Sequence, residues 1–337
     1  MTEKKILVAG GAGFIGSNFV HHILEKYPNY RIVNFDKLTY AGNLDNLADL
    51  LTESRYEFVK GDIADEAAVA AVLSTGITDV VNFAAETHVD RSIHVGSRDF
   101  VLANVLGVQT LLDAERKIPG IRHLQVSTDE VYGSLELDDE TAFTEDTPFT
   151  PNVPYAAAKA GGDLLCRAFF KTFGSDVLVT HCSNNYGPYQ FPEKLIPFFI
   201  DRAMNDQPLP LYGDGKNVRD WLYVRDHCEA LDAVLHKGTA GEVYNIGGHF
   251  ERPNIDIARI ILRALGKDES LLTFVTDRPG HDRRYAIDAS KIERELGWKP
   301  RYNFETAIQE TVQWYREHQD WVEAIKQRSA AINAHVE

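Results

Sequence analysis

The stretch KILVAGGAGFIG, residues 5–16, decides the fold. An apolar run from Lys5 to Ala9 leads directly into Gly10, Gly13 and Gly16, where an amphipathic stretch begins. A strand that turns sharply through glycines into a helix suits a dinucleotide, because the backbone can approach a pyrophosphate and helix N-terminal amides can bind it. Glycines also serve ordinary turns, so the spacing alone leaves both interpretations open.

Outward from this turn, short apolar runs alternate with longer amphipathic stretches. Strands are predicted at Lys5 to Ala9, Arg31 to Asp36, Tyr56 to Gly61, Asp79 to Ala84 and His123 to Ser127, and helices at Gly16 to Lys26, Glu66 to Leu73 and Phe100 to Lys117. This βαβαβ order indicates an α/β protein with a doubly wound parallel sheet of the Rossmann type.

Beyond Tyr155 the pattern changes. The sequence predicts a helix from Tyr155 to Phe173, a strand from Asp176 to Cys182, polar and aromatic loops at Asn185 to Lys194 and Asp214 to Asp226, and helices at Asp226 to Leu235, Ile255 to Leu265, Ser290 to Glu295 and Phe304 to Lys326. Loops this long in a compact domain are usually functional. We expect an NAD-binding domain over residues 1–180 with contributions from later segments, a smaller, partly interleaved substrate-binding lobe over 181–325, and a frayed tail over 326–337.

The composition excludes several classes of protein. With 35 basic and 50 acidic side chains the net charge is −15, which argues against a nucleic-acid partner because phosphate neutralisation needs a basic stripe. No apolar run approaches the roughly 20 residues of a membrane helix, and no signal peptide follows Met1. Three cysteines without close spacing indicate reduced thiols in the cytoplasm, and no metal-ligand spacing is present.

An acidic residue ends the second predicted strand. Asp36 lies about 20 residues after Gly16, where a carboxylate can bind both ribose hydroxyls, so it favours NAD over NADP. Lys37 leaves NADP open, since a cation can accommodate a 2′-phosphate. Asp62 follows the third strand and suits either the adenine edge or an ordinary surface position.

Tyr155 and Lys159 are four residues apart at the start of a predicted helix, so they share one face. A phenol with an ordinary pKa of about 10 needs help to act as a base near neutrality, and an adjacent ammonium lowers that pKa. An exposed tyrosine beside a surface lysine is the common alternative. The preceding glycine turn and the proline-rich helix entry favour a catalytic pair.

The motif STDEVYG, residues 127–133, begins at the carboxyl end of the fifth predicted strand, where open α/β sheets bind ligands. Its adjacent carboxylates, Asp129 and Glu130, repel each other, so one pKa should rise and place an acid beside a base. Removing water from a sugar needs such a couple. Acids at a helix N-terminus are the structural alternative.

Together these motifs resemble the nucleotide-sugar 4,6-dehydratases of the extended short-chain dehydrogenase/reductase family. The resemblance extends from about residue 4 to residue 320 and lies in Gly10 to Asn18, Phe35 to Asn43, Asn82 to Ile93, Ser127 to Gly133, Ser183 to Pro197, Asn217 to His227 and Arg278 to Asp288. It implies an NAD-dependent hydro-lyase that converts dTDP-glucose to dTDP-4-keto-6-deoxy-glucose and water by C4 oxidation, elimination across C5 and C6, and hydride return to C6.

The resemblance also implies roles for individual residues. The implied catalytic residues are Thr128, Asp129, Glu130, Tyr155 and Lys159. Tyr155 would take the 4-hydroxyl proton, Glu130 would take the C5 proton, and Asp129 would protonate the 6-hydroxyl. Thr128 would hold the 4-oxygen, and Lys159 would bridge the nicotinamide ribose and Tyr155. Cofactor contacts are implied for Gly10, Gly13, Phe14, Ile15, Gly16, Asp36, Lys37, Thr39, Asp62, Ile63, Ala84, Ala85, Thr87, Tyr155 and Lys159. Substrate contacts are implied for Thr128, Asn184, Lys194, Leu195, Pro210, Tyr212, Arg219, Asn254, Arg278 and His281. Judged by charge alone, Lys194 and the basic loop around Arg278 suit a solvent-exposed surface as well as a substrate contact.

Several alternatives remain open. A UDP-glucose dehydratase would share these motifs, and a 4-epimerase would share Tyr155 and Lys159 but need no acid-base couple at C5 and C6. A non-catalytic NAD sensor would typically lose the tyrosine or lysine. By family analogy, the helices at Phe100 to Lys117 and Tyr155 to Phe173 would pair in a homodimer. Three residues depart from the family pattern. Relatives commonly have serine at the positions of Val153 and Ala156 and often have arginine at that of His181. We expect these departures to affect the rate of the reaction more than its type.

Overall fold

A seven-stranded parallel sheet forms the centre of the computed structural model, which describes residues 3–94, 96–277 and 280–333. Its strands are β1 (Lys5–Ala9), β2 (Arg31–Asp36), β3 (Tyr56–Lys60), β4 (Asp79–Asn82), β5 (Arg122–Thr128), β6 (Asp176–Cys182) and β10 (Val243–Ile246). They lie in the order β10-β6-β5-β4-β1-β2-β3. Successive strands are therefore added to one side of β1 up to β3 and to its other side from β4 onward, although β1 and β4 are parallel. This confirms the predicted doubly wound sheet, and ligands bind at such a reversal.

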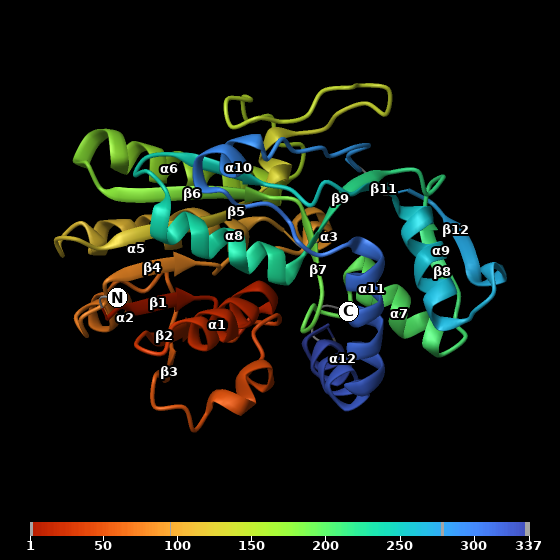
Figure 1. Cartoon of the computed structure of the whole chain (residues 1–337), viewed down its shortest axis with the longest axis horizontal. Helices are drawn as coiled ribbons and strands as arrows, with labels where there is room; N and C mark the ends of the chain where they lie inside the picture. Colours follow the sequence, from red (N-terminus) through yellow and green to blue (C-terminus); the bar gives the residue numbers. More distant parts are fainter. Residues whose placement is uncertain (1–2, 95, 278–279, 334–337) are drawn as a thin grey trace.

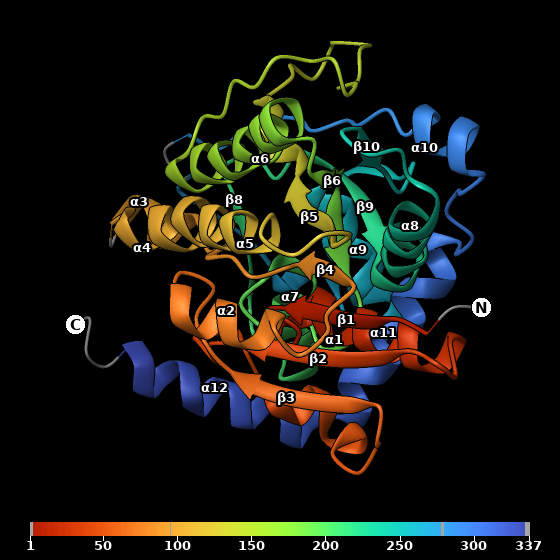
Figure 2. The same cartoon turned by 90° about the vertical axis from the view of Figure 1, so that its left-hand side faces the viewer.

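Helices cover both faces of the sheet (Figure 2). One face carries α1 (Phe14–Lys26), α8 (Val224–Lys237) and α10 (Ser290–Leu296), and the other carries α2 (Glu66–Leu73), α5 (Val108–Glu115) and α6 (Pro154–Phe173). Strand β1 shows why both are needed: Ile6 and Val8 are buried toward α1, whereas Leu7 and Ala9 are buried toward α2 and α5. A strand buried on both faces reads as a continuous apolar run.

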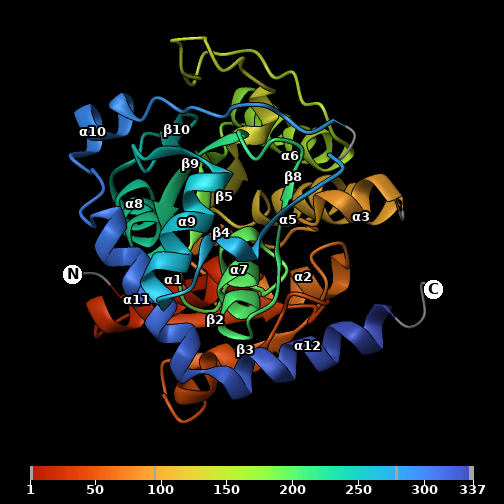
Figure 3. The same ribbon diagram turned by 90° about the vertical axis from the view of Figure 1, so that its right-hand side faces the viewer.

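A second lobe with its own core lies beside the large sheet, on the right of Figure 1 and facing the viewer in Figure 3. It contains the strands β7 (Asn184–Tyr186), β9 (Val218–Tyr223) and β11 (Glu251–Pro253) in one sheet, the pair β8 (Leu209–Tyr212) and β12 (Leu272–Val275), and the helices α7 (Leu195–Met204), α9 (Asn254–Leu265), α11 (Phe304–Glu317) and α12 (Gln319–Asn333). The chain leaves this lobe to add β10 to the large sheet and then returns.

Several elements differ from those predicted. The expected loop at Asp214 to Asp226 contains β9, and the expected helix from Phe304 to Lys326 is divided into α11 and α12 at His318. The expected helix from Phe100 to Lys117 is α4 (Arg98–Val101), the π-helical η2 (Leu102–Gly107) and α5. The sequence did not predict α3 (Val89–His94), α7, η1 (Leu44–Leu50), η4 (Glu269–Leu271) or the strands after β6.

The end of the chain was also predicted differently. Residues 326–333 belong to α12, so our expectation of a frayed tail was wrong for them, and residues 334–337 lie outside the described part. This helix returns to the first lobe, where Trp321 Nε1 donates to Asn46 Oδ1 at 2.9 Å and Arg328 Nη1 donates to Asn43 Oδ1 at 3.0 Å. No helix within the described residues is long and apolar enough to cross a bilayer.

Candidate active site

A cavity of about 570 Å³ opens at the carboxyl ends of β1, β2, β4 and β5, with further lining from the start of the second lobe. This volume lies in the range of small-molecule sites. All the residues predicted for catalysis and cofactor binding line it: Gly10, Gly13, Phe14, Ile15, Gly16, Asp36, Lys37, Thr39, Asp62, Ile63, Ala84, Ala85, Thr87, Thr128, Asp129, Glu130, Tyr155 and Lys159. The sheet thus gathers side chains that are far apart in sequence.

The glycine turn forms a cradle for an anion. Gly10 has φ +76°, and a Cβ there would lie 2.6 Å from the backbone nitrogen of Ala84. A Cβ on Gly16 would lie 2.3 Å from the carbonyl oxygen of Gly10. Helix α1 begins at Phe14 with Gly13 as N-cap, and neither a side-chain cap nor a first-turn acid meets its amides. This geometry fits the pyrophosphate of a dinucleotide.

Gly10→Ala is expected to weaken NAD binding by at least about tenfold, because the turn must shift and even one lost charge-assisted hydrogen bond removes about 1.5–3 kcal/mol. Titration calorimetry measures the affinity. Gly76→Ala is the matched control, since Gly76 has φ +87° but no neighbour within 4 Å of an added Cβ. Unchanged affinity in Gly10→Ala would contradict the cradle.

The carboxylate of Asp36 lies at the end of β2 with 7% of its surface exposed. Its Oδ2 accepts from the amide of Ala12 at 3.0 Å and its Oδ1 from that of Leu38 at 2.7 Å. Burial raises the pKa of Asp36, and these two amides oppose the rise. Lys37 Nζ lies 2.7 Å from Asp62 Oδ2, so its charge is already paired. A paired lysine is a poorer partner for a 2′-phosphate, which favours NAD.

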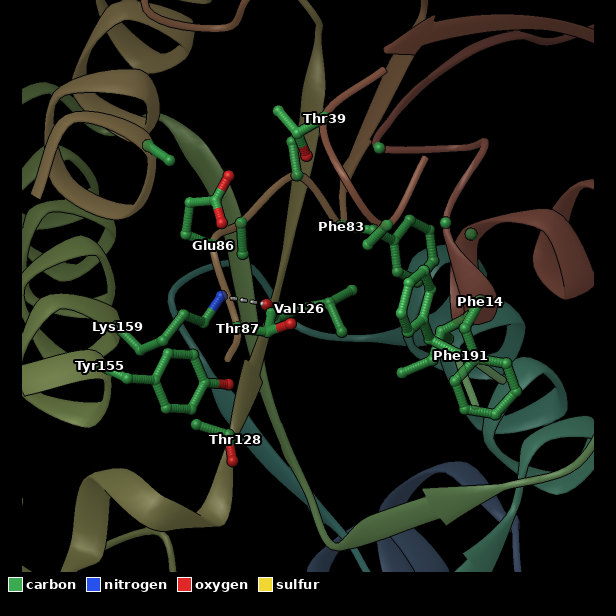
Figure 4. A pocket seen from close by; sticks show the side chains of 18 of the residues that line it. Phe14, Thr39, Phe83, Glu86, Thr87, Val126, Thr128, Tyr155, Lys159 and Phe191 are labelled. Carbon is green, nitrogen blue, oxygen red and sulfur yellow. Dashed lines mark hydrogen bonds between the residues drawn. The ribbon is translucent and has the colours of Figure 1, made fainter. Parts of the chain in front are cut away.

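Tyr155 and Lys159 project from the first turns of α6 into the cavity (Figure 4). Lys159 Nζ donates to the carbonyl oxygen of Val126 at 2.8 Å. Burial raises the pKa of Tyr155 well above its ordinary value, and the charge of Glu130 raises it further. The net pKa of Tyr155 is therefore raised and not lowered as we expected, because desolvation of the phenolate dominates. Burial also lowers the pKa of Lys159.

The predicted carboxylate pair follows β5 in the short helix η3 (Asp129–Tyr132). Thr128 caps this helix, and its Oγ1 accepts from the amide of Glu130 at 3.3 Å. Asp129 is 2% exposed, and burial followed by the charge of Glu130 raises its pKa well above the ordinary value. Its Oδ2 has no hydrogen-bond partner among the described residues. Glu130 is only half-buried. The raised pKa of Asp129 fits the predicted acid, and the neighbouring Glu130 is more exposed to solvent than Asp129 is.

The residues predicted to contact the substrate divide into two groups. Asn184 and Lys194 line the cavity, and Lys194 Nζ donates to the carbonyl oxygen of Thr87 at 3.4 Å. Those outside the lining are Leu195, Pro210, Tyr212, Arg219, Asn254 and His281, all in or beside the second lobe. Arg278 lies outside the described residues.

Two of the second-lobe residues nevertheless carry features of a polar site. The guanidinium of Arg219 donates to the carbonyl oxygen of Asp282 at 3.0 Å and lies 4.2 Å from the centre of the Tyr285 ring. Its charge partly opposes the rise in the pKa of Asp129, so it acts across the boundary of the cavity. Asn254 Oδ1 is buried without a hydrogen-bond partner among the described residues. Neither residue lines the cavity that contains Asp129 and Glu130.

Known proteins match this chain over most of its length. The family model described as GDP-mannose 4,6 dehydratase matches residues 7–311. The dTDP-glucose 4,6-dehydratase of Xanthomonas campestris pv. campestris (strain B100) is 53% identical over 338 residues, which cover 95% of each chain. The chain belongs to the dTDP-glucose 4,6-dehydratase family.

Solved structures agree with this membership. The dTDP-glucose 4,6-dehydratase of Bacillus anthracis str. Ames, crystallised in complex with NAD, has a TM-score of 0.90 and 50% identity, covering 96% of this chain and 99% of that one. The dTDP-glucose 4,6-dehydratase DesIV of Streptomyces venezuelae, solved with NAD and a second ligand, has a TM-score of 0.92 and 49% identity, covering 95% and 99%.

Sequence reasoning missed other residues that line the cavity of this dTDP-glucose 4,6-dehydratase family member. They include Phe35, Tyr40, Phe83, Glu86, Cys182 and Phe191. Tyr40 meets Phe191 edge to face at 5.5 Å, and the guanidinium of Arg91 lies 4.8 Å from the centre of the Tyr40 ring. Only the density of aromatic residues between Asn185 and Lys194 pointed to this wall. Among the described residues, no group of three or more His, Cys, Asp or Glu is arranged to hold a metal.

The three departures expected from the family pattern lie on or next to α6 and on β6. Val153 is the N-cap of α6 and provides no side-chain hydrogen bond, which a serine there would supply. Ala156 is fully buried against a small apolar cluster. His181 is 1% exposed and contacts Asp163 of α6.

Proposed function

We propose that this chain is an NAD-dependent hydro-lyase that converts dTDP-glucose into dTDP-4-keto-6-deoxy-glucose and water. The observation that carries the proposal is one cavity holding a buried, raised-pKa Asp129, a half-buried Glu130, Tyr155 and Lys159. Expelling an unactivated hydroxyl requires an acid and a base on neighbouring carbons next to an oxidation site. The names of the relatives and the NAD in their structures support this assignment.

The reaction begins at C4 of the glucose. The cradle of Gly10, Gly13 and Gly16 and the carboxylate of Asp36 would hold NAD, which would supply the hydride acceptor for C4 and the hydride donor for C6. Tyr155 removes the 4-hydroxyl proton, and Thr128, next to it in Figure 4, holds the oxygen. Because burial opposes a phenolate, Tyr155 needs a nearby positive charge. Lys159 supplies it one helical turn away, and its hydrogen bond to Val126 uses only one of three ammonium donors.

The elimination follows from the new 4-ketone, which acidifies the hydrogen on C5. Glu130 takes this proton as the C5–C6 double bond forms, and Asp129 protonates the 6-oxygen as the C6–O bond breaks, so that water leaves. After hydride addition at C6, Glu130 returns a proton to C5. Activity therefore requires ionised Glu130 and protonated Asp129, and it is lost as pH rises through the elevated pKa of Asp129.

Incubation with dTDP-glucose tests the proposal, because the 4-keto product absorbs in alkali. A galactose nucleotide would instead reveal a 4-epimerase, which the Asp129–Glu130 pair argues against, and no turnover would reveal a non-catalytic sensor. Parallel incubation with UDP-glucose tests the base preference. We expect faster turnover of dTDP-glucose, in line with the relatives.

We also propose a homodimer. Apolar side chains are exposed on the helices expected to pair: Val101 at 49%, Leu106 at 41%, Leu164 at 55% and Phe173 at 51%. A patch of this kind marks an interaction surface. We expect a homodimer in sedimentation and a monomer for the double variant Leu106→Asp/Leu164→Asp, which places charges in this surface.

Leu137→Asp is the control for the dimer prediction, since Leu137 is 43% exposed but lies in the loop between η3 and α6 and not on either helix. That variant should sediment as the wild type does. A wild-type monomer would contradict the homodimer. We further propose a cytoplasmic location, which the buried free thiols of Cys166, Cys182 and Cys228 support.

A further inference from the structure

Behind the catalytic cavity, Asp163 lies one helical turn beyond Lys159 on α6. Tyr155, Lys159 and Asp163 are spaced by four residues, so they share one face of the helix. This face meets the end of β5, where Lys159 Nζ donates to the carbonyl oxygen of Val126 at 2.8 Å and Ser127 Oγ donates to Asp163 Oδ2 at 2.6 Å. The lysine and the aspartate are therefore anchored to consecutive residues of the same strand.

Both charged groups are shielded from water: Lys159 is 4% exposed and Asp163 is 3% exposed. A buried ammonium costs several kcal/mol unless an opposite charge compensates it. Asp163 Oδ1 has no hydrogen-bond partner among the described residues, so no donor engages this oxygen. Burial lowers the pKa of Lys159, and the charge of Asp163 is the largest influence that opposes this fall.

A histidine contacts the carboxylate of Asp163. His181 Nε2 lies 3.2 Å from Asp163 Oδ2, and His181 Nδ1 lies 2.6 Å from the hydroxyl of Tyr132. The hydroxyl of Tyr132 donates to Asn245 Oδ1 at 2.8 Å. The amide nitrogen of Asn245 in turn donates to the carbonyl oxygen of Phe143. His181 therefore bridges Asp163 and Tyr132 through its two ring nitrogens.

We infer that Asp163 is a positioning residue whose carboxylate, held by Ser127 and His181, keeps Lys159 cationic in its buried place. This inference rests on the proposed function, in which the Lys159 cation supports ionisation of Tyr155. Asp163 does not line the cavity, so it acts through Lys159 rather than on the substrate.

Other titratable groups also face this pair. Around Lys159 they are Tyr155 and Cys166 on α6 and Cys182 on β6; around Asp163 they are His181 on β6, Cys166 on α6 and Tyr132 on η3. Burial raises the pKa of both thiols, to about 12 for Cys182. The thiols are therefore neutral near pH 7, and Asp163 is the anion that faces Lys159.

The test compares the pH dependence of Asp163→Asn with that of the wild-type holoenzyme. Without the carboxylate, Lys159 loses its proton at lower pH, so the ratio of kcat at about pH 9 to kcat at about pH 7 should fall by about tenfold, as for a shift of one pKa unit. KM for dTDP-glucose should change little. Asp163→Glu, which keeps the charge, should restore most of the ratio.

A readout independent of turnover follows the same amine. Acetic anhydride acylates only neutral amines, and peptide mass spectrometry gives the modified fraction of Lys159 at each pH. Half-modification should occur at lower pH in Asp163→Asn than in the wild type. This measurement separates two failures: a wild type that forms no 4-keto product refutes the proposed function, whereas an unshifted acylation curve refutes the role of Asp163.

The matched control is Asp232→Asn, another buried carboxylate with histidine partners, His22 at 3.1 Å and His236 at 2.8 Å, but on α8 outside the cavity. It should lower thermal stability without changing the shape of the pH profile. Equal activity loss at every pH in Asp163→Asn would overturn the inference.

His181→Gln provides the test if Asp163→Asn does not fold. Removing the imidazole takes one competing partner from the Asp163 carboxylate, so both the alkaline limb of kcat and the acylation curve should move to higher pH. No movement, or movement to lower pH, would overturn the inference.

Discussion

Glu130→Gln is expected to lower the rate of product formation by about 10²- to 10⁴-fold, the usual contribution of a general base. The amide cannot take the C5 proton, whereas Tyr155 and Lys159 remain in place for oxidation at C4. The reaction should therefore stop at the 4-keto-glucose nucleotide, with the cofactor left reduced. Rapid-mixing absorbance of NADH and the alkaline assay of the product measure the two stages separately.

Glu140→Gln is the control for this prediction, since Glu140 is exposed in the loop that follows η3 and does not line the cavity. It should turn over at the wild-type rate. Product formation by Glu130→Gln at close to that rate would show that another group removes the C5 proton.

Tyr155→Phe is expected to abolish both stages, again by about 10²- to 10⁴-fold in rate, because no side chain then accepts the 4-hydroxyl proton. Neither NADH nor the 4-keto product should accumulate, which distinguishes this variant from Glu130→Gln. The same rapid-mixing experiment makes the comparison. Tyr302→Phe, in the second lobe and outside the cavity, is the control.

Accumulation of NADH in Tyr155→Phe would contradict the role of the phenol as base. Retained NAD binding, measured by calorimetry, would show that the loss lies in chemistry and not in assembly of the site.

The large sheet could be predicted from sequence because its strands are buried on both faces. The bounds of β1, β2, α2 and β6 agree with those expected, since apolar runs and helical periodicity end at the same residues as the elements. The division of α11 from α12 was missed because the amphipathic pattern continues through His318, where only one residue departs from helical geometry. Strand β9 was missed because pairing with β7 and β11 stabilises it, and pairing between distant segments leaves no local pattern.

The site was predicted unevenly for a related reason. Residues next to the ends of parallel strands, such as Asp36, Thr128 and Asp129, must meet at one edge of the sheet, so their position followed from the fold. The pKa of Tyr155 could not be predicted from its spacing to Lys159, because it depends on how deeply the ring is buried. The placement of Arg219 and Asn254 depends on the pairing of β9 with β11, which leaves no local pattern in the sequence.

The return of β10 to the large sheet has a practical consequence for protein engineering. Residues 243–246 complete the edge beside β6, although much of the second lobe precedes them in the chain. A fragment truncated near residue 180 would lack this strand and α8, exposing backbone and apolar side chains that favour aggregation. Chimaeras that exchange sugar specificity between relatives should therefore be designed with several crossover points around the second lobe rather than a single junction.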